Sequence, residues 1–317
     1  MGIFDKRTNY KPFEYPGILQ FTEAMNRSFW VHSEIEFTAD VQDFKAHLTE
    51  VEREVVKRSL LGIAQVEVGV KLFWGDIYKH FPKPEFNGLA ATFAESEFRH
   101  SEAYSRLLEV LGYEKDFAKL PEVPVFQKKI ALIEDSLYAE QDIIGKLLFF
   151  TIVIENASLF SQFANILSFT RFKGYLKNTS NIIAWTSIDE QTHASAGIYL
   201  LNLLKEEGHL PPAMLERMTD EVRRYIRYEE ELLDWIYEAG ELDFFGKEDM
   251  LNFMKYRVDD ALVRIGAAKA FGITEAQYAP MKWFDEEVFA NELDDFFAKR
   301  PTAYTKHDKS IHATDLF

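Results

Sequence analysis

Two isolated glutamates interrupt long apolar stretches of this chain, and they limit the folds that it can adopt. Glu67 is the only charged residue in 60–70, and Glu155 is the only one in 147–170. A buried carboxylate costs several kcal/mol unless it is paired with a cation or bound to a metal. Each glutamate therefore needs a partner that another part of the chain brings into the core. For one isolated glutamate, a Lys or Arg on a neighbouring helix is the simplest partner.

Two Glu-x-x-His pairs supply a different kind of partner. Glu97 precedes His100 by three residues, and Glu190 precedes His193 by the same spacing. Residues at i and i+3 share one face of a helix, so each pair can aim a carboxylate and an imidazole at one point. A third pair, within 206–209, falls at a helix end marked by glycine and proline, where both side chains are expected to be solvated.

The order of these residues repeats along the chain. Glu97 follows Glu67 by 30 residues, and Glu190 follows Glu155 by 35. Each gap is long enough for one helix, a turn and the return. Four helices would then direct four carboxylates and two imidazoles at one centre, which is the ligand set of ferritin-like dinuclear carboxylate proteins. Oxygen ligands with two imidazoles suit iron or manganese and disfavour copper(I) and structural zinc.

The remaining pattern predicts an all-α chain. Apolar residues recur with helical spacing nearly throughout, without alternating strands and helices, a glycine-rich phosphate loop or an internal repeat. We expect a ferritin-like helical bundle with a dinuclear metal site in its core and extra helices, as one domain over 1–300, and a flexible polar tail over 301–317. The expected helices cover about 49–78, 84–112, 125–135, 139–169, 174–207, 213–239, 247–271 and 274–278.

Composition excludes several kinds of chemistry. Lys and Arg total 36 against 52 Asp and Glu, a net charge of −16, which argues against nucleic acid or an anionic membrane as the main partner. The chain has no Cys, which excludes disulfides, thiolate metal ligands, iron–sulfur clusters and cysteine nucleophiles. The apolar stretch 147–170 could suggest a membrane span, but Glu155, Gln162 and two asparagines within it favour a core helix. Residues 1–15 are polar and carry no signal-peptide core, so we expect a cytoplasmic protein.

These motifs resemble those of the radical-generating small (β) subunit of class I ribonucleotide reductase, from about Trp30 to the C-terminus. In that family a Tyr four residues after the first ligand His is the usual site of the stable radical, and Tyr104 stands there. The family's Asp just before the second ligand Glu is matched by Asp189, and such an Asp bonds the outer nitrogen of a ligand His, here His100. The resemblance implies a set of metal ligands consisting of Glu67, Glu97, His100, Glu155, Glu190 and His193.

The resemblance also implies a radical route and a partner. Trp30 matches the Trp that relays the radical from the metal site through the Asp. Tyr304 lies in the tail, where the family has a Tyr that passes the radical between subunits, and Leu316-Phe317 resembles the apolar end that docks the small subunit onto the large (α) subunit. The large subunit would reduce ribonucleoside diphosphates to deoxyribonucleotides with the one-electron oxidising equivalent supplied by this chain. A homodimer and a flavoprotein activator are further implied partners.

Departures from the family pattern favour manganese. The first ligand is most often Asp in the family but is Glu67 here, and a longer ligand at this position is familiar from members whose cofactor contains manganese. Thr186, four residues before Glu190, makes the pocket expected around Tyr104 more polar than usual. We therefore expect two manganese ions, with the oxidising equivalent held by the metals. Two iron ions or a mixed manganese–iron pair stay open, because the ligand types do not exclude iron. A radical on Tyr104 is the alternative location of the oxidising equivalent.

Lys71 and Trp74 are the remaining candidates. They follow Glu67 by four and seven residues, which places them on its helical face. A Lys beside the metal site would pair with a ligand carboxylate or steer an anionic oxidant, or else it would extend outward into solvent. Two other functions fit such a bundle. One is a ferritin-like oxidase or hydroxylase with an open channel to the metals, and the other is metal storage, which needs neither Trp30 nor a tail.

Overall fold

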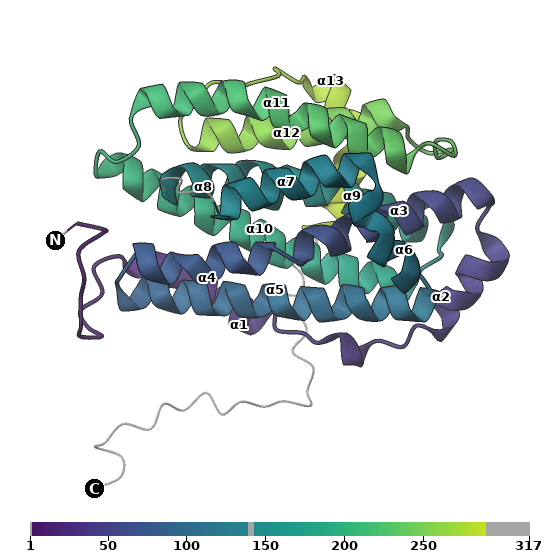
Figure 1. Cartoon of the computed structure of the whole chain (residues 1–317), viewed down its shortest axis with the longest axis horizontal. Helices are drawn as coiled ribbons and strands as arrows, with labels where there is room; N and C mark the ends of the chain where they lie inside the picture. The colour runs from purple at the N-terminus through teal and green to yellow at the C-terminus, as the bar shows by residue number, and fades with distance from the viewer. Residues whose placement is uncertain (1, 139–142, 290–317) are drawn as a thin grey trace, which may run out of the picture.

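The computed structural model describes residues 2–138 and 143–289, and these form a layered bundle of helices (Figure 1). The longer helices are α1 (Leu19–Arg27), α3 (Glu50–Glu67), α4 (Val70–His80), α5 (Pro84–Leu111), α7 (Pro124–Tyr138), α9 (Leu159–Lys173), α10 (Lys177–Glu206), α11 (Pro212–Ile236) and α12 (Lys247–Arg264). The short helices are η1 (Pro16–Ile18), η2 (His32–Glu34), α2 (Thr38–Gln42), α6 (Glu114–Lys119), η4 (Leu120–Glu122), α8 (Ile143–Phe149), α13 (Glu275–Tyr278), η6 (Ala279–Met281) and α14 (Lys282–Val288). Two π-helical segments are η3 (Asp43–His47) and η5 (Phe150–Ser158).

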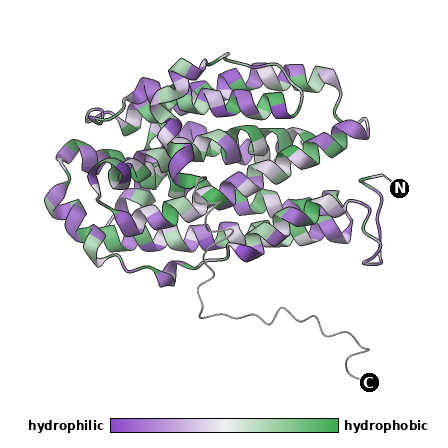
Figure 2. Ribbon diagram, turned by 180° about the vertical axis from the view of Figure 1, so that it is seen from behind, coloured by the Kyte–Doolittle hydropathy of each residue, from purple (hydrophilic) through white to green (hydrophobic). Residues whose placement is uncertain are grey.

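The layers of the bundle place four segments around a common centre. In Figure 1, α11 and α12 form the top layer, α7 to α9 run through the middle, and α4 and α5 lie below. α3 packs against α5 and α9, while α10 packs against η5 and α9. The outer helix α11 buries residues every three or four positions on one side only, and Figure 2 shows hydrophilic and hydrophobic residues on different sides of the outer helices. The all-α prediction is confirmed for the residues described.

The most apolar part of the chain is a core helix. α8, η5 and α9 run continuously over Ile143–Lys173, which is long and apolar enough to cross a membrane, but 94% of its most apolar window is buried inside the protein. This helix therefore provides the centre of the bundle. Its middle, η5, is π-helical, and π-helical turns within α-helices are frequent at functional sites.

One expected helix is in fact two helices. The prediction of a single helix over 49–78 is wrong, because α3 ends at Glu67 and α4 begins at Val70. The turn between them leaves backbone carbonyls without helical partners. The Lys71 ammonium satisfies two of these, since its Nζ lies 2.9 Å from the carbonyl oxygens of both Glu67 and Val68. The break therefore falls directly after a candidate metal ligand.

Glycine sets another helix end that differs from the prediction. α12 stops at Arg264, well before Phe271, because Gly266 adopts a left-handed conformation with φ +81°. The N–H of Ala267 then donates to the carbonyl of Leu262 at 2.9 Å, which closes the end of the helix.

Candidate metal centre

Six titratable side chains meet in the core of the bundle. Each of them is at most 1% exposed. One comes from the end of α3, two from α5, one from η5 and two from α10. In the same order they are Glu67, Glu97 with His100, Glu155, and Glu190 with His193.

The six side chains form two overlapping groups, each with ligand atoms that lie within 4.8 Å of one another. The first group, a candidate site that we call the first ion position, consists of Glu67, Glu97, His100 and Glu190. The second group, which we call the second ion position, consists of Glu97, Glu155, Glu190 and His193. Glu97 and Glu190 belong to both groups, so the six side chains together would suit a pair of cations and not a single one.

Among the residues that the structure describes, the inward-facing atoms of this cluster have no hydrogen-bond partners. His193 Nδ1 lies 2.9 Å from Glu97 Oε1, and His100 Nδ1 lies 3.0 Å from Glu190 Oε1, but neither contact has hydrogen-bond geometry. Both oxygens of Glu67 are likewise buried without a hydrogen bond. Such groups are costly to bury unless something binds them. Carboxylate oxygens and imidazole nitrogens that converge in this way fit a pair of iron or manganese ions.

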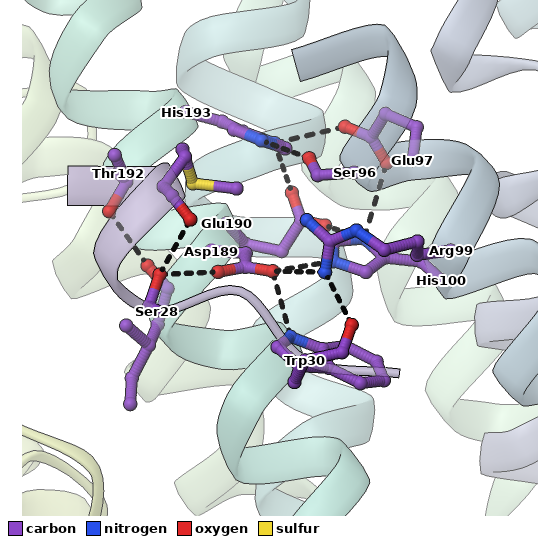
Figure 3. A network of polar contacts seen from close by, with 12 residues as sticks. Ser28, Trp30, Ser96, Glu97, Arg99, His100, Asp189, Glu190, Thr192 and His193 are labelled. Atoms are coloured by element: carbon purple, nitrogen blue, oxygen red, sulfur yellow. Dashed lines mark hydrogen bonds and ion pairs between the residues drawn. The ribbon is translucent and has the colours of Figure 1, made fainter. Parts of the chain in front are cut away.

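The outward-facing atoms, in contrast, are bonded to the protein. His193 Nε2 lies 2.9 Å from Ser96 Oγ, and Trp74 Nε1 donates to Glu155 Oε1 at 2.8 Å (Figure 3 shows the histidine contacts). His100 Nε2 lies 3.1 Å from Asp189 Oδ2, the contact that the sequence predicts. Outer hydrogen bonds of this kind fix the orientation of metal-binding side chains.

Charges within the cluster shift its pKa values in opposite directions. Burial raises the pKa of Glu67 and Glu190, and the neighbouring carboxylates raise it further. Burial also acts to raise the pKa of Glu97, but the two imidazoles outweigh it and lower that pKa to about 2. For His193, burial lowers the pKa, but Glu97 and Glu155 outweigh it and raise the value to about 10. Protons therefore compete with metal ions for these atoms.

A hydrogen-bonded chain leads out of the cluster to Trp30. The indole Nε1 donates to Asp189 Oδ2 at 3.0 Å, and the same oxygen contacts His100. The Trp30 and His100 rings also stack, with centroids 5.7 Å apart. Arg99, which the sequence reasoning missed, donates from Nη1 to the Trp30 carbonyl at 3.0 Å (Figure 3). Spacing gives no signal for Arg99, because adjacent residues on a helix do not share a face and its burial is visible only in the structure.

Tyr104 lies on α5 one turn beyond His100 and is 1% exposed. Burial, and then the charge of Glu67, raise the pKa of Tyr104 well above its usual range, while the Thr186 hydroxyl acts in the opposite direction. Within the described part of the chain, neither hydroxyl makes a hydrogen bond of good geometry. The surroundings of the Tyr104 hydroxyl therefore offer no hydrogen-bond partner of good geometry, but they include a second hydroxyl, that of Thr186.

Lys71 and Trp74 lie near the cluster in ways that the helical-face argument did not anticipate. Lys71 bonds to backbone carbonyls at the break after α3, and its Nζ also lies 3.2 Å from Ser101 Oγ. Lys71 and Ser101 line a groove of about 380 Å³ beside the backbone of Glu67. Trp74 binds Glu155, which comes from a different segment. Tyr304 and the tail 301–317 lie outside the described residues.

Comparisons with known proteins agree with this geometry. Residues 7–280 match the family model described as "Ribonucleotide reductase, small chain". A relative from Invertebrate iridescent virus 3, named "Probable ribonucleoside-diphosphate reductase small subunit 048L", is 25% identical and covers 95% of this chain and 85% of its own. The ribonucleotide reductase R2 subunit from Clostridium botulinum has a similar fold, with a TM-score of 0.78 at 20% identity over 90% of this chain and 93% of that one. Dimanganese(II)-NrdF from Streptococcus sanguinis is similar too, with a TM-score of 0.72 at 20% identity over 87% of this chain and 97% of that one. This chain belongs to the ribonucleotide reductase small chain family.

Proposed function

We propose that this chain generates the oxidising equivalent for a ribonucleoside-diphosphate reductase and delivers it to a large subunit. The observation that carries the proposal is the continuous contact from the buried cluster through His100 and Asp189 to Trp30. An oxidase that acts on a substrate at its own metals, or a storage protein, has no use for such a route. Family membership makes the same assignment.

Each residue of the route has a distinct task. When bound, the two metal ions would supply a one-electron oxidising equivalent, with the six clustered side chains as their ligands. Trp30 is the ring that would pass an electron inward, because its face lies against His100. Asp189 accepts the indole N–H and so holds that proton in place during the transfer. The burial of Trp30, at 4% exposed, keeps water away from the oxidised ring.

We further propose that both ions are manganese. The longer first ligand, Glu67, supports this choice, as does the likeness in fold to a dimanganese(II) protein. The Thr186 hydroxyl beside Tyr104 makes the pocket a poor one for a long-lived tyrosyl radical, so the oxidising equivalent would stay on the metals. Two iron ions, or one of each metal, are the competing compositions.

The partner supplies the chemistry that this chain lacks. Ribose reduction needs thiols, and this chain has no Cys, so the substrate site belongs to the large subunit. The tail 301–317, with Tyr304 and the terminal Leu316-Phe317, is our candidate for the docking and relay segment. A homodimer and a flavoprotein activator complete the proposed assembly. Lys71, which lines the groove beside the Glu67 backbone, would attract an anionic oxidant.

Metal analysis with electron paramagnetic resonance tests the proposed centre. The full chain is loaded with manganese or with iron, activated, and assayed with the cognate large subunit. We expect activity with a coupled manganese signal and no tyrosyl signal. A diferric centre with a sharp tyrosyl signal, together with activity only in the iron-loaded protein, would contradict the manganese proposal.

Deleting the last five residues, 313–317, tests the proposed docking tail. The shortened chain should keep both ions and lose turnover with the large subunit. Unchanged turnover would remove the tail from the interface.

A further inference from the structure

A buried cation bridges two segments directly beside two proposed ligands. Arg257 lies on α12, outside the four segments that carry the ligands, and is 7% exposed. Its Nε donates to the carbonyl oxygen of Asn156 at 2.6 Å, and its Nη2 donates to Gln191 Oε1 at 2.8 Å. Asn156 follows Glu155 in the sequence, and Gln191 follows Glu190. The Arg257 guanidinium thus connects η5 and α10, next to Glu155 on η5 and next to Glu190 on α10.

The bridge is held from several sides. The Asn156 side chain donates back, from Nδ2 to the carbonyl of Arg257 at 2.7 Å. The guanidinium lies 3.6 Å from the centroid of the Phe160 ring. Gln191 Nε2 lies 3.3 Å from Ser195 Oγ, which fixes the amide with its oxygen toward the cation. Because the guanidinium is a planar fork with donors in fixed directions, these contacts define one separation of the two segments.

The buried Arg257 guanidinium costs more free energy than apolar side chains would at the same position in the core. Among the described residues, the hydrogen-bond acceptors of Arg257 are neutral oxygens of Asn156 and Gln191, and the carboxylate of partly exposed Asp285 is farther away, at 3.9 Å. Burial lowers the pKa of Arg257 to about 10. A cation buried against neutral acceptors destabilises a fold relative to apolar packing. Packing alone therefore does not explain why a guanidinium occupies this position.

The backbone on one side of the bridge is irregular. η5 is π-helical, and its hydrogen-bond ladder differs from that of the α-helical segments α8 and α9 on either side. Arg257 occupies the carbonyl of Asn156 within this segment, one residue from Glu155. A change of η5 to regular α-helix would shift the register of Glu155 relative to α10, and the bridge opposes that change.

We propose that Arg257 is a positioning residue for the metal centre, which sets the separation of η5 and α10 and thereby the affinity of the second ion position. Both Glu155 and Glu190 belong to that position, whereas the first position lacks Glu155. Loss of the bridge should therefore weaken the second position selectively. The inference rests on the proposed function only in that the cluster binds two ions.

Titration of chelator-treated full-length protein with Mn(II) tests this role. Calorimetry gives the two affinities, and electron paramagnetic resonance separates a lone ion from a coupled pair. For Arg257→Met we expect the second affinity to fall about 10- to 100-fold, as for other residues that orient ligands from behind. The first affinity should stay within about threefold. Arg257→Lys keeps the charge but loses the fork, so its loss should be intermediate.

Two further variants keep the test decisive. Arg7→Met removes another buried guanidinium, which pairs with Glu85 at the start of α5, and should leave both affinities unchanged. Gln191→Leu removes only the α10 end of the bridge at a partly exposed position, and should weaken the second position up to about 10-fold. It decides the question if Arg257→Met does not fold.

Two results would overturn the proposal. One is binding of both ions by Arg257→Met or Gln191→Leu with the affinities of the unaltered chain. The other is an equal loss at both positions that Arg7→Met reproduces. If the unaltered chain does not bind a pair of ions at all, the proposed metal centre itself fails; if it does and Arg257→Met matches it, only the positioning role fails.

Discussion

Two clusters of buried charge in this protein are built in opposite ways. The first, which we call the metal-facing cluster, consists of the six buried carboxylate and imidazole side chains of the candidate metal centre. The second, which we call the N-terminal charge cluster, consists of Arg7, Glu14, Lys83 and Glu85. In the N-terminal charge cluster, Glu85 accepts hydrogen bonds from both ends of the Arg7 guanidinium and from two backbone N–H groups. Lys83, with 0% exposure, donates to Glu14 at 2.9 Å. Each of these charges has an opposite charge within reach; Glu14 is partly exposed, and the other three are buried.

The metal-facing cluster has an excess of carboxylates, and its inward atoms have no hydrogen bonds to any part of the chain that the structure describes. The pKa values report the same contrast. Burial acts to raise the pKa of Glu85, but backbone N–H groups and Arg7 outweigh it and lower that pKa. Burial and like charges instead raise the pKa of Glu67 and Glu190. Buried charge that is paired serves the fold, whereas buried charge that is left unpaired and convergent serves a ligand.

The largest expected effect is the difference in metal binding between a substitution in the metal-facing cluster and one in the N-terminal charge cluster. Glu97 contributes to both ion positions, so Glu97→Ala should abolish binding of both ions and any turnover with the large subunit. Glu85→Gln, about 18 Å away along α5 at 1.5 Å per residue, should leave metal content unchanged. It should lower the free energy of unfolding by about 3–5 kcal/mol, because it breaks a buried ion pair.

Metal analysis and denaturant unfolding of both variants measure this contrast. Retention of two ions by Glu97→Ala would break the comparison, as would loss of metal from a folded Glu85→Gln.

A second prediction tests whether the oxidising equivalent leaves the metal-facing cluster through Trp30. Trp30→Phe removes the indole N–H that Asp189 accepts, so turnover should fall by about 100-fold or more, at unchanged metal content. Trp235→Phe is the matched control, because Trp235 lies on α11 away from the route and stacks against Arg58. Steady-state assays should find its turnover within about twofold of the unaltered chain. Equal activity of the two variants would remove Trp30 from the route.

The clusters should respond to pH in different ranges. His193, with a pKa of about 10, must lose a proton to bind metal, so metal affinity should rise about 10-fold per pH unit for each proton displaced between pH 6 and 9. The lowered pKa of Glu85 makes the stability from the N-terminal charge cluster fully present above pH 4.5, and it should disappear as pH falls below that value.

Proton release during calorimetric metal titration, in two buffers of different ionisation enthalpy, measures the first response. Acid unfolding of the unaltered chain and Glu85→Gln measures the second. Metal binding without release of protons would contradict the assigned ligands.

The smallest effect concerns Tyr104. If the metals hold the oxidising equivalent, Tyr104→Phe should keep turnover within about threefold and keep both ions. Thr186→Val, which makes the pocket less polar, should change turnover equally little. Loss of turnover in Tyr104→Phe, measured with manganese-loaded protein, would place the radical on this residue.

The sequence predicts the metal-facing cluster better than it predicts the surrounding structure. The spacing of Glu67, Glu97, Glu155 and Glu190 is enough to bring them together, because buried charges in apolar helices leave few arrangements. The break after Glu67 was missed, although Gly69 within the apolar run was a signal. The capping of the freed carbonyls by Lys71 depends on a side-chain direction that spacing does not reveal.

Long-range partners were beyond sequence reasoning. Arg257 is one of many charged residues on an amphipathic helix, and only the packing of α12 on η5 brings it to Asn156. The sequence places Trp74 on the helical face of Glu67, and its indole donates to Glu155, a partner 81 positions away that spacing does not reveal. The N-terminal charge cluster joins residues more than 70 positions apart, such as Arg7 and Glu85. Such pairings follow from the fold and have no periodic signature.

The most direct test of the account is deoxyribonucleotide formation by the manganese-loaded full-length chain with its cognate large subunit and nucleoside diphosphates. Glu97→Ala serves as the negative control and Arg7→Met as the control for a buried charge outside the site. We predict turnover with the unaltered chain and with Arg7→Met, and none with Glu97→Ala. Turnover that does not depend on Glu97, or its absence from the unaltered chain with bound metal and a competent large subunit, would contradict the central claim.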